Sequence, residues 1–358
     1  MTKDEIFVFN PHVKQPLEKP FYFGVVGLAH AHINGMCAGL KGEGATLKAI
    51  YDDDKALLDE FVKKNPEVKV YDTLEELLAD DEISLIASAA IPSHRADLAI
   101  RSMRAGKDFF VDKAPLITFE ELDAVKACCR ETGKKLFVYY SEFMHVEAAI
   151  YAKQLIERGV IGDVCHIDIF APHTLAANTR PDWFFSRKDT SGILTDIGSH
   201  QFQQFLEYSG ADNATVCSAR VDNYFNKHYT EFDDFGDATL TAENGVTGYV
   251  RIDWLSPTGI QTWGDGRVTI IGSRGYIELR KYCNIGYPKT INNVLVATND
   301  GAFIECVTGK VGYPYFARLI EDCINRTDTA MSPEQTFNAI ELAMTAQKMG
   351  LEYKATLK

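Results

Sequence analysis

The sequence lacks the features that would assign it at once to a specialised class of protein. No stretch of the 358 residues approaches roughly 18 consecutive apolar positions, so we expect no transmembrane helix. The start of the chain has neither an apolar core flanked by basic residues nor a small-residue cleavage site, so we expect no secretory signal. There is also no internal repeat and no low-complexity linker. Together these absences predict a globular protein of the cytoplasm.

Basic residues and paired cysteines are also scarce. The chain has 37 Lys and Arg against 50 Asp and Glu, a formal net charge of −13, and such a surface repels polyanions. We therefore expect no nucleic-acid partner and no anionic membrane partner. The eight cysteines form no C-x-x-C pair, so the sequence indicates neither a zinc knuckle nor a thioredoxin-like redox pair. Reduced cysteines and no metal centre are the expectation.

The first half of the chain alternates apolar runs with helical stretches, and the length favours two domains. The runs are uniformly apolar, as in strands that are buried on both faces of a sheet. Short connections between such strands imply right-handed crossovers and a parallel, doubly wound sheet. The six expected strands are 21–26, 47–51, 68–71, 85–90, 109–111 and 136–140.

The second half loses this rhythm. After a helix at 146–158, a strand at 164–170 and an irregular segment, a helix is expected over 193–208. Residues 237–242 and 246–254 then alternate apolar and polar positions around Asn244-Gly245, a strong hairpin signal. We predict an α/β protein with an irregular arm at 1–20, a Rossmann domain at 21–142, and a second α/β domain at 143–358 whose open sheet is largely antiparallel.

A glycine-containing turn lies where the first strand meets the first helix. Gly27 opens the segment Gly-Leu-Ala-His-Ala-His, and Ala29 and His32 stand where the G-x-G-x-x-G fingerprint has its later glycines. A helix N-terminus at that point offers free N–H groups and the positive end of a dipole to a phosphate. We expect the pyrophosphate of a dinucleotide along this turn, on Gly27, Leu28, Ala29, His30 and Ala31.

Three acids end the second strand. Asp52 lies 25 residues after Gly27, where a carboxylate can accept both hydroxyls of the adenosine ribose; the alternative role for Asp52 is to cap the following helix. With Asp53 and Asp54 beside it and no adjacent arginine, a 2′-phosphate would be repelled. The sequence therefore favours NAD over NADP. Ala89 and Asp112, at the ends of the fourth and fifth strands, complete the expected cofactor contacts.

Two further segments carry side chains that can move protons. Asp196 and His200 are four residues apart, so on one helix they emerge on the same face, and a carboxylate there can raise the basicity of an imidazole. Such a pair also occurs as a simple surface or capping pair. Lys113 lies at the end of the fifth strand, where a lysine faces either the ligand crevice or solvent.

Taken together, these segments resemble the Gfo/Idh/MocA oxidoreductases over about residues 21–350. The resemblance is carried by the Gly27 turn, the acid after the second strand, Asp112-Lys113-Ala114-Pro115, and Gly192-x-x-x-Asp196-x-x-x-His200. Two positions depart from the family pattern: Asp112-Lys113-Ala114-Pro115 replaces E-K-P, and His94 or Arg95 stands near the customary histidine.

The resemblance implies NAD(P)-dependent oxidation of a sugar, an inositol or a related polyol by a homodimer or homotetramer. Lys113 matches the lysine of the E-K-P element, and Asp196 and His200 match the catalytic D-x-x-x-H pair. On this basis His200 is the expected general base, supported by Asp196 and Lys113.

The long segment 171–187 precedes the D-x-x-x-H element and is rich in aromatic and polar residues, as functional loops are. We expect His173, Arg180 and Trp183 to contact the substrate. Three alternatives stay open: a non-catalytic NAD-binding sensor of the same fold, an NAD-assisted glycosidase, and a metal-dependent hydrolase that would use His30-x-His32.

Overall fold

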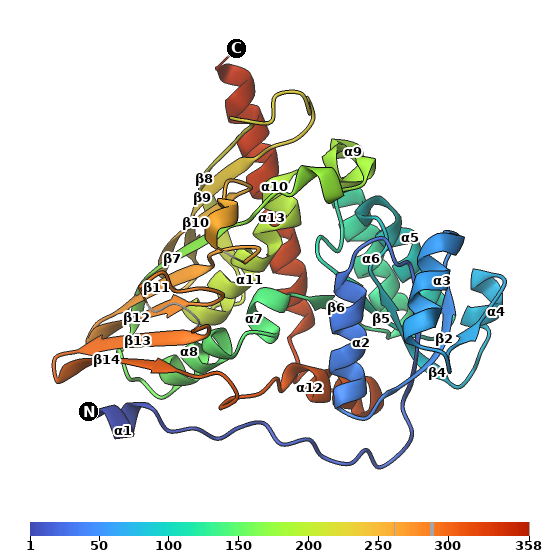
Figure 1. Ribbon diagram of the computed structural model, residues 1–358, viewed down its shortest axis with the longest axis horizontal. Coiled ribbons are helices and arrows are strands. Elements are labelled where there is room, and N and C mark those ends of the chain that lie inside the picture. The colour runs from blue at the N-terminus through green and yellow to red at the C-terminus, as the bar shows by residue number, and fades with distance from the viewer. Residues whose placement is uncertain (261, 287–289, 358) are drawn as a thin grey trace. The chain divides into compact units, whose positions relative to one another are not determined.

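The chain divides into two units by its internal contacts. The computed structural model describes residues 1–260, 262–286 and 290–357. One unit, here called the Rossmann unit, consists of Val13–Tyr139 and Pro314–Phe337. The other, here called the open-sheet unit, consists of Met1–His12, Tyr140–Tyr313 and Asn338–Lys358. Figure 1 shows the elements of both.

Within the described residues, the Rossmann unit contains a six-stranded sheet with the order β3-β2-β1-β4-β5-β6, in which every neighbouring pair is parallel. This is the order of a doubly wound dinucleotide-binding sheet, as the sequence predicts. The strands are β1 (Tyr22–Val26), β2 (Thr46–Tyr51), β3 (Lys69–Val70), β4 (Ile83–Ser88), β5 (Asp108–Asp112) and β6 (Leu136–Tyr139).

The central strands are apolar because both of their faces are covered, and every residue of β5 is buried. The helix boundaries follow local signals: the Thr73 hydroxyl accepts a hydrogen bond from the Glu76 amide at 3.2 Å and so caps the start of α4. The helices of this unit are α2 (His32–Gly42), α3 (Lys55–Lys64), α4 (Leu74–Leu78), α5 (Pro92–Arg104), α6 (Phe119–Thr132) and α12 (Tyr315–Asn325).

The segment 314–337 belongs to the Rossmann unit, whereas the sequence analysis placed all of 143–358 in the second domain. Two contacts explain the difference. The Arg326 guanidinium donates to both carboxylate oxygens of Asp108, at 2.6 and 3.0 Å. The ring of Phe316, in α12, lies directly against the backbone of Gly39 in α2. Packing between residues this far apart in sequence leaves no local signal.

In the part of the chain that the structure describes, the open-sheet unit has an eight-stranded sheet with the order β14-β13-β12-β11-β7-β10-β9-β8. Only β7 and β10 pair in parallel, so the prediction of a largely antiparallel sheet is confirmed. The strands are β7 (Val164–Pro172), β8 (Ala214–Asp222), β9 (Phe235–Ala242), β10 (Thr247–Asp253), β11 (Arg267–Gly272), β12 (Gly275–Arg280), β13 (Asn293–Thr298) and β14 (Gly301–Cys306).

Helices cover one face of this sheet (Figure 1): α11 contacts β7 and β10, and α8 contacts β12 and β13. The predicted hairpin at Asn244-Gly245 is confirmed, because β9 and β10 pair around it. The helical elements are α1 (Lys3–Ile6), α7 (Ser141–Met144), α8 (Glu147–Glu157), η1 (Ala177–Thr179), η2 (Asp182–Phe185), α9 (Arg187–Thr190), α10 (Ile193–Asp196), α11 (Gly198–Ser209), η3 (Thr258–Ile260) and α13 (Pro333–Thr356), which begins in the other unit.

The first residues of the chain are more ordered than the irregular arm expected at 1–20. Thr2 and Glu5 form a capping box that starts α1. The Tyr151 hydroxyl donates to the carbonyls of Ile6 and Val8, at 3.0 and 3.1 Å. These bonds attach Met1–His12 to the open-sheet unit, which is why the arm divides at residue 12.

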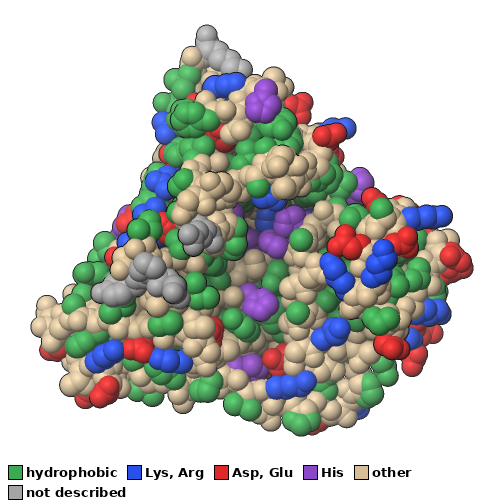
Figure 2. Space-filling view, viewed as in Figure 1, with side chains coloured by type: hydrophobic (Ala, Val, Ile, Leu, Met, Phe, Trp, Pro, Cys, Tyr) green, Lys and Arg blue, Asp and Glu red, His purple; other side chains and the backbone are tan. Residues whose placement is uncertain are grey.

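Two general features of the molecule are the distribution of charge on its surface and the length and polarity of its helices. On the face seen in Figure 2, Lys and Arg side chains are interspersed with Asp and Glu instead of forming one basic area. Among the described residues, no helix combines the length and the apolar character needed to cross a bilayer.

The contact between α2 and α12 gives a stability prediction. A Cβ at Gly39 would lie 2.2 to 2.4 Å from three carbons of the Phe316 ring, so Gly39→Ala must push α12 away. We expect urea denaturation to give a free energy of unfolding lower by about 1–3 kcal/mol. The control is Gly42→Ala in the same helix, where the new Cβ would have no described atom within 4 Å. That variant should be unchanged, or more stable by up to about 1 kcal/mol. Equal stability of the two variants would contradict the packing argument.

Candidate active site

The turn after β1 is shaped by one glycine. Gly27 has φ +86°, and a Cβ there would lie 2.5 Å from the Cβ of Ala90, so any other residue would be strained and would clash. The turn is fastened to the end of β4, because the Ala89 amide donates to the Gly27 carbonyl at 3.1 Å and the His30 amide donates to the Ala89 carbonyl at 3.0 Å. The predicted phosphate turn therefore has a fixed main chain and no side chain at its first residue.

The Asp52 carboxylate lies against this turn. It accepts hydrogen bonds from the backbone amides of Leu28 and Asp54, each at 2.7 Å. The capping of α3, which the sequence left as an alternative role for Asp52, is performed by Asp54, whose carboxylate accepts the amides of Ala56 and Leu57. Burial raises the pKa of Asp52, and the two backbone hydrogen bonds partly oppose that change.

These residues fit a dinucleotide. A Cβ at Gly27 would fill space against Ala90, Ala29 is small, and Asp52 keeps carboxylate lone pairs that a ribose hydroxyl could use. The helix α2 starts at His32 after Ala31, whose side chain makes no capping hydrogen bond. The His32 amide donates to Nδ1 of His30 at 3.4 Å, a long bond that a phosphate at this helix N-terminus could replace.

A buried carboxylate joins the turn to the end of β5. Asp112 lies 2.8 Å from Nδ1 of His32 and 3.1 Å from Nδ1 of His30, and the Lys113 amide donates to it at 2.8 Å. Burial by itself would raise the pKa of Asp112, but the charges of His32 and His30 and their hydrogen bonds bring it well below its ordinary value. Burial and the charge of His32 lower the pKa of His30 to about 4.

Arg95 is the second anchor of this edge. Its buried guanidinium donates to the carbonyls of Ala90, Asp112 and Ala114, at 2.7 to 2.9 Å, and lies 3.5 Å from the Asp112 carboxylate. Of the two candidates near the family histidine, Arg95 is thus the one built into the edge, while His94 is exposed. Sequence reasoning missed this structural role of Arg95.

A metal site requires several ligand atoms close together. Among the described residues, this condition is met by the ligand-type atoms of His30, His32 and Asp112, which lie within 4.8 Å of one another. The charges around them oppose such a site. Arg95 is 3.5 Å from Asp112, and the positive charge of Lys113 lowers the pKa of His30. A further cation would have to enter beside two existing ones, so this edge is better suited to an anionic ligand.

In the open-sheet unit, the D-x-x-x-H element lies across a helix junction. Asp196 ends α10 and His200 lies in the first turn of α11, whereas one helix over 193–208 was expected. Ile197 between them keeps helical angles, φ −69° and ψ −40°. The break therefore leaves the four-residue spacing within helical backbone. His200 is buried, and Asp196 is half-buried.

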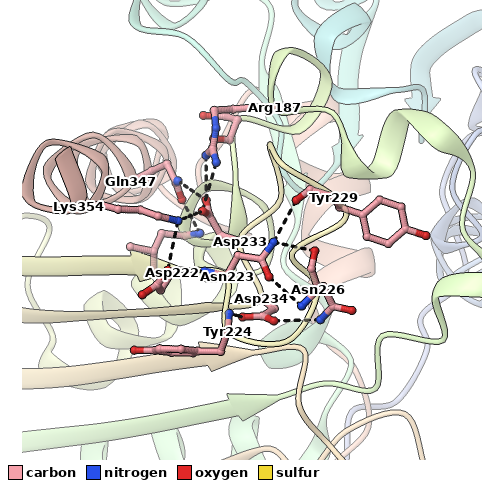
Figure 3. A network of polar contacts seen from close by, with 12 residues as sticks. Arg187, Asp222, Asn223, Tyr224, Asn226, Tyr229, Asp233, Asp234, Gln347 and Lys354 are labelled. Carbon is pink, nitrogen blue, oxygen red and sulfur yellow. Dashed lines mark hydrogen bonds and ion pairs between the residues drawn. The ribbon is translucent and has the colours of Figure 1, made fainter. Parts of the chain in front are cut away.

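A buried network holds α10 in place (Figure 3). Asp233 accepts two hydrogen bonds from Arg187, at 2.8 and 3.2 Å, and one from Gln347 at 3.0 Å. The side-chain oxygen of Gln347, Oε1, accepts a hydrogen bond from the Leu194 amide at 2.9 Å. At Gly192 a Cβ would lie 2.3 Å from the Gln347 side chain, which explains the glycine of the motif. The segment that carries Asp196 is thereby tied to α13.

The predicted substrate residues lie in the same unit. Cζ of Arg180 stacks over the rings of Phe184 and Trp254, at 4.7 and 5.2 Å, and its charge interacts with Asp196. Trp183 packs edge-on against Phe184, with ring centroids 6.2 Å apart. The ring of His173 lies between Trp254 and Trp263, with centroids 5.4 and 4.7 Å away. The structure therefore places both Arg180 and His173 among aromatic rings.

Two buried charged residues were missed by the sequence analysis. Glu142, in α7, is 3% exposed, and Lys281, just after β12, is 1% exposed. Their charged atoms are 2.9 Å apart, and Nε2 of Gln201 also donates to Glu142 at 3.0 Å. A charged residue a few positions after the sixth strand, which ends at Tyr139, was a signal for Glu142. Nothing local marked Lys281, 139 positions further along the chain.

Comparison with known proteins agrees with these features. Residues 21–140 match the model of an oxidoreductase family with an NAD-binding Rossmann fold, and residues 150–278 match the GFO/IDH/MocA C-terminal domain. A crystal structure of a protein from Erwinia carotovora atroseptica that is named as an oxidoreductase is 42% identical, with a TM-score of 0.90, over 92% of this chain and 98% of that one.

Two curated relatives are more distant. An uncharacterised oxidoreductase from Streptococcus pneumoniae is 24% identical over 72% of this chain and 68% of its own length. The scyllo-inositol 2-dehydrogenase (NAD(+)) of Bacillus subtilis is 25% identical over 71% of each chain.

The lowered pKa of His30 predicts a pH-dependent stability. Its ordinary pKa of 6.5 falls to about 4 in the folded protein, so between these values the unfolded chain binds a proton that the folded chain does not. The free energy of unfolding should therefore decrease as the pH falls from 6.5 to 4, by about 1–3 kcal/mol from this group, whose side chain is 18% exposed. Urea denaturation across this range should show a shallower decrease for His30→Asn. The exposed His94→Asn should keep the wild-type slope, and an equal slope in all three proteins would contradict the assignment.

Proposed function

Because the chain belongs to the Gfo/Idh/MocA oxidoreductase family, we propose that it is an NAD-dependent dehydrogenase acting on a hydroxyl-bearing carbon of a sugar, an inositol or a related polyol. The observation that carries the cofactor part is the bond from the Leu28 amide to the Asp52 carboxylate, which fixes the Gly27 turn beside an acid suited to a ribose. The substrate class is carried over from relatives such as the scyllo-inositol dehydrogenase.

In this proposal the Rossmann unit holds the cofactor. The amides of the Gly27 turn and of the start of α2 would meet the pyrophosphate, and Asp52 would accept the ribose hydroxyls. Asp52 with its neighbours Asp53 and Asp54 would repel a 2′-phosphate, which favours NAD over NADP. When bound, NAD⁺ accepts a hydride from the substrate carbon.

The remaining chemistry falls to side chains of this chain. His200 takes the proton of the substrate hydroxyl as the carbonyl forms, so its imidazole becomes positively charged. Lys113 and Asp196 orient the hydroxyl and stabilise the charges that develop. Arg180, His173 and Trp183 would contact the rest of the substrate; the stacking of Arg180 on two rings fixes its guanidinium before any ligand arrives.

A direct test incubates the purified protein with NAD⁺ and a panel of inositols and aldoses, and follows the near-ultraviolet absorbance of NADH. Turnover of at least one compound supports the proposal. Binding of NAD⁺ in calorimetry with no turnover across the panel would favour a non-catalytic sensor, and no binding of either nicotinamide coenzyme would reject both.

The base can be tested separately. We expect His200→Gln to lower kcat by about a hundredfold or more, because proton transfer is lost, while the Kd of NAD⁺ measured by calorimetry stays unchanged. His228→Gln, an exposed histidine of the same unit, is the matched control and should keep full turnover. A near-normal kcat for His200→Gln would remove the assignment.

The cofactor acid gives an independent prediction. Asp52→Asn should weaken NAD⁺ binding by about tenfold, since it removes the charged acceptor of both the Leu28 amide and the ribose hydroxyls. Asp59→Asn removes an exposed carboxylate from α3 and should leave the Kd unchanged. Equal affinities for wild type and Asp52→Asn would contradict the role of Asp52.

A further inference from the structure

The short helix that carries Asp196 begins at a turn that cannot cap it. Ser191 and Gly192 precede α10 with φ values of +66° and +127°, and a turn of this kind is kept only where its surroundings fix it. Gly192, the N-cap, has no side chain that could accept a hydrogen bond from the first amides of the helix. The start of α10 therefore depends on groups from elsewhere in the chain.

An acceptor for the start of α10 comes from the last helix, α13. Oε1 of Gln347 accepts a hydrogen bond from the Leu194 amide at 2.9 Å, and Nε2 of the same side chain donates to Asp233 at 3.0 Å (Figure 3). A backbone N–H can only donate and a carboxylate can only accept, so the side chain between them must accept on one side and donate on the other. Glutamate lacks the donor and methionine lacks both groups. The two contacts together therefore require a side-chain amide.

The carboxylate of Asp233 holds the other side of the turn as well. It accepts two hydrogen bonds from Arg187, at 2.8 and 3.2 Å, and Nη1 of Arg187 also donates to the Ser191 carbonyl at 3.4 Å. Asp233 is thus linked to Ser191 through Arg187 and to Leu194 through Gln347. Because Asp233 is buried, it must keep these donors, so the turn is fixed at both of its ends.

The fixed turn leads directly to Asp196. The Asp196 amide donates to the Gly192 carbonyl at 2.9 Å, and the Asp196 carbonyl accepts a hydrogen bond from the Ser199 hydroxyl at 2.7 Å. Gly192 lies against Gln347, since a Cβ there would be 2.3 Å from Nε2 of that side chain. A continuous series of contacts therefore joins the Gln347 amide to the backbone of Asp196.

We propose that Gln347 is a positioning residue: it caps α10 from α13, with Asp233 as its anchor, and thereby sets the place of the Asp196 backbone. The cap exists without substrate, whereas its meaning in turnover rests on the proposed function, in which Asp196 orients the substrate hydroxyl. A displacement of about 1 Å in a group that aligns the substrate can lower the rate about a hundredfold. Loss of the cap should therefore lower kcat.

The variant for the test is Gln347→Met, which keeps a similar length but has neither the donor nor the acceptor. The Leu194 amide loses its acceptor, so it should exchange with solvent about five- to tenfold faster, as expected for one hydrogen bond. kcat should fall by about tenfold to a hundredfold, because Asp196 is no longer held in place. The Kd of NAD⁺ should stay unchanged, because the expected cofactor residues lie in the Rossmann unit.

Exchange is followed residue by residue in NMR spectra of the full-length, ¹⁵N-labelled protein after transfer to D₂O, and kcat is measured on a polyol that wild type oxidises. The matched control is Lys348→Met, which introduces the same side chain at the exposed neighbouring position of α13 and should leave both quantities as in wild type. A wild-type exchange rate for Leu194 in Gln347→Met would overturn the cap. A less stable Gln347→Met protein with wild-type kcat would overturn the positioning role, since it would reveal a contribution to stability alone.

Wild type decides the matter if Gln347→Met fails to fold. One side-chain N–H of Gln347 is donated to a buried carboxylate, so these protons should exchange slowly, and rapid exchange overturns the proposal. The polyol panel separates the two levels of inference. Faster Leu194 exchange in Gln347→Met, with no turnover by wild type, would retain the cap and reject the dehydrogenase. Turnover by wild type and an equal kcat in Gln347→Met would do the reverse.

Discussion

The desolvation of buried carboxylates is the constraint on which the functional edges of both units depend. A carboxylate removed from water is unfavourable by several kcal/mol unless fixed donors surround it, so each one determines the positions of many neighbours. Asp112 is surrounded by two imidazoles, an amide and a guanidinium. Glu142 has an ammonium, an amide group and an imidazole, and Asp233 has a guanidinium and an amide group. The loops that supply these donors are therefore held in place by the carboxylates.

This constraint explains how irregular backbone becomes a precise site. The Gly27 turn, the end of β4 and the end of β5 have no regular hydrogen-bond ladder beyond the sheet, yet Asp52, Asp112 and Arg95 tie all three together. In the open-sheet unit, Asp233 and Gln347 do the same for the start of α10. The polar contacts fix the backbone where it is irregular, and a fixed backbone is what positioned chemistry needs.

The sequence predicted those parts of the molecule that are encoded locally. Uniform apolar runs identified the parallel strands, and Asn244-Gly245 identified the hairpin, because each of these signals depends on neighbours within a few residues. The helix break at Ile197 escaped prediction, since helical angles continue through it. The placement of 314–337 and the pairing of Glu142 with Lys281 also escaped, because both depend on contacts between residues more than a hundred positions apart.

The two units share one arrangement, a buried carboxylate that acts on two histidines, and in both the carboxylate has a permanent cation beside it. Asp112 has Arg95, and Glu142 has Lys281. A buried carboxylate stays ionised only where opposite charge or hydrogen-bond donors surround it. Arg95 lies 3.5 Å from Asp112 and Lys281 lies 2.9 Å from Glu142, so each supplies part of that compensation. Because each carboxylate must keep these partners in place, it fixes the side chains around it, and this fixed arrangement is what a positioned site requires.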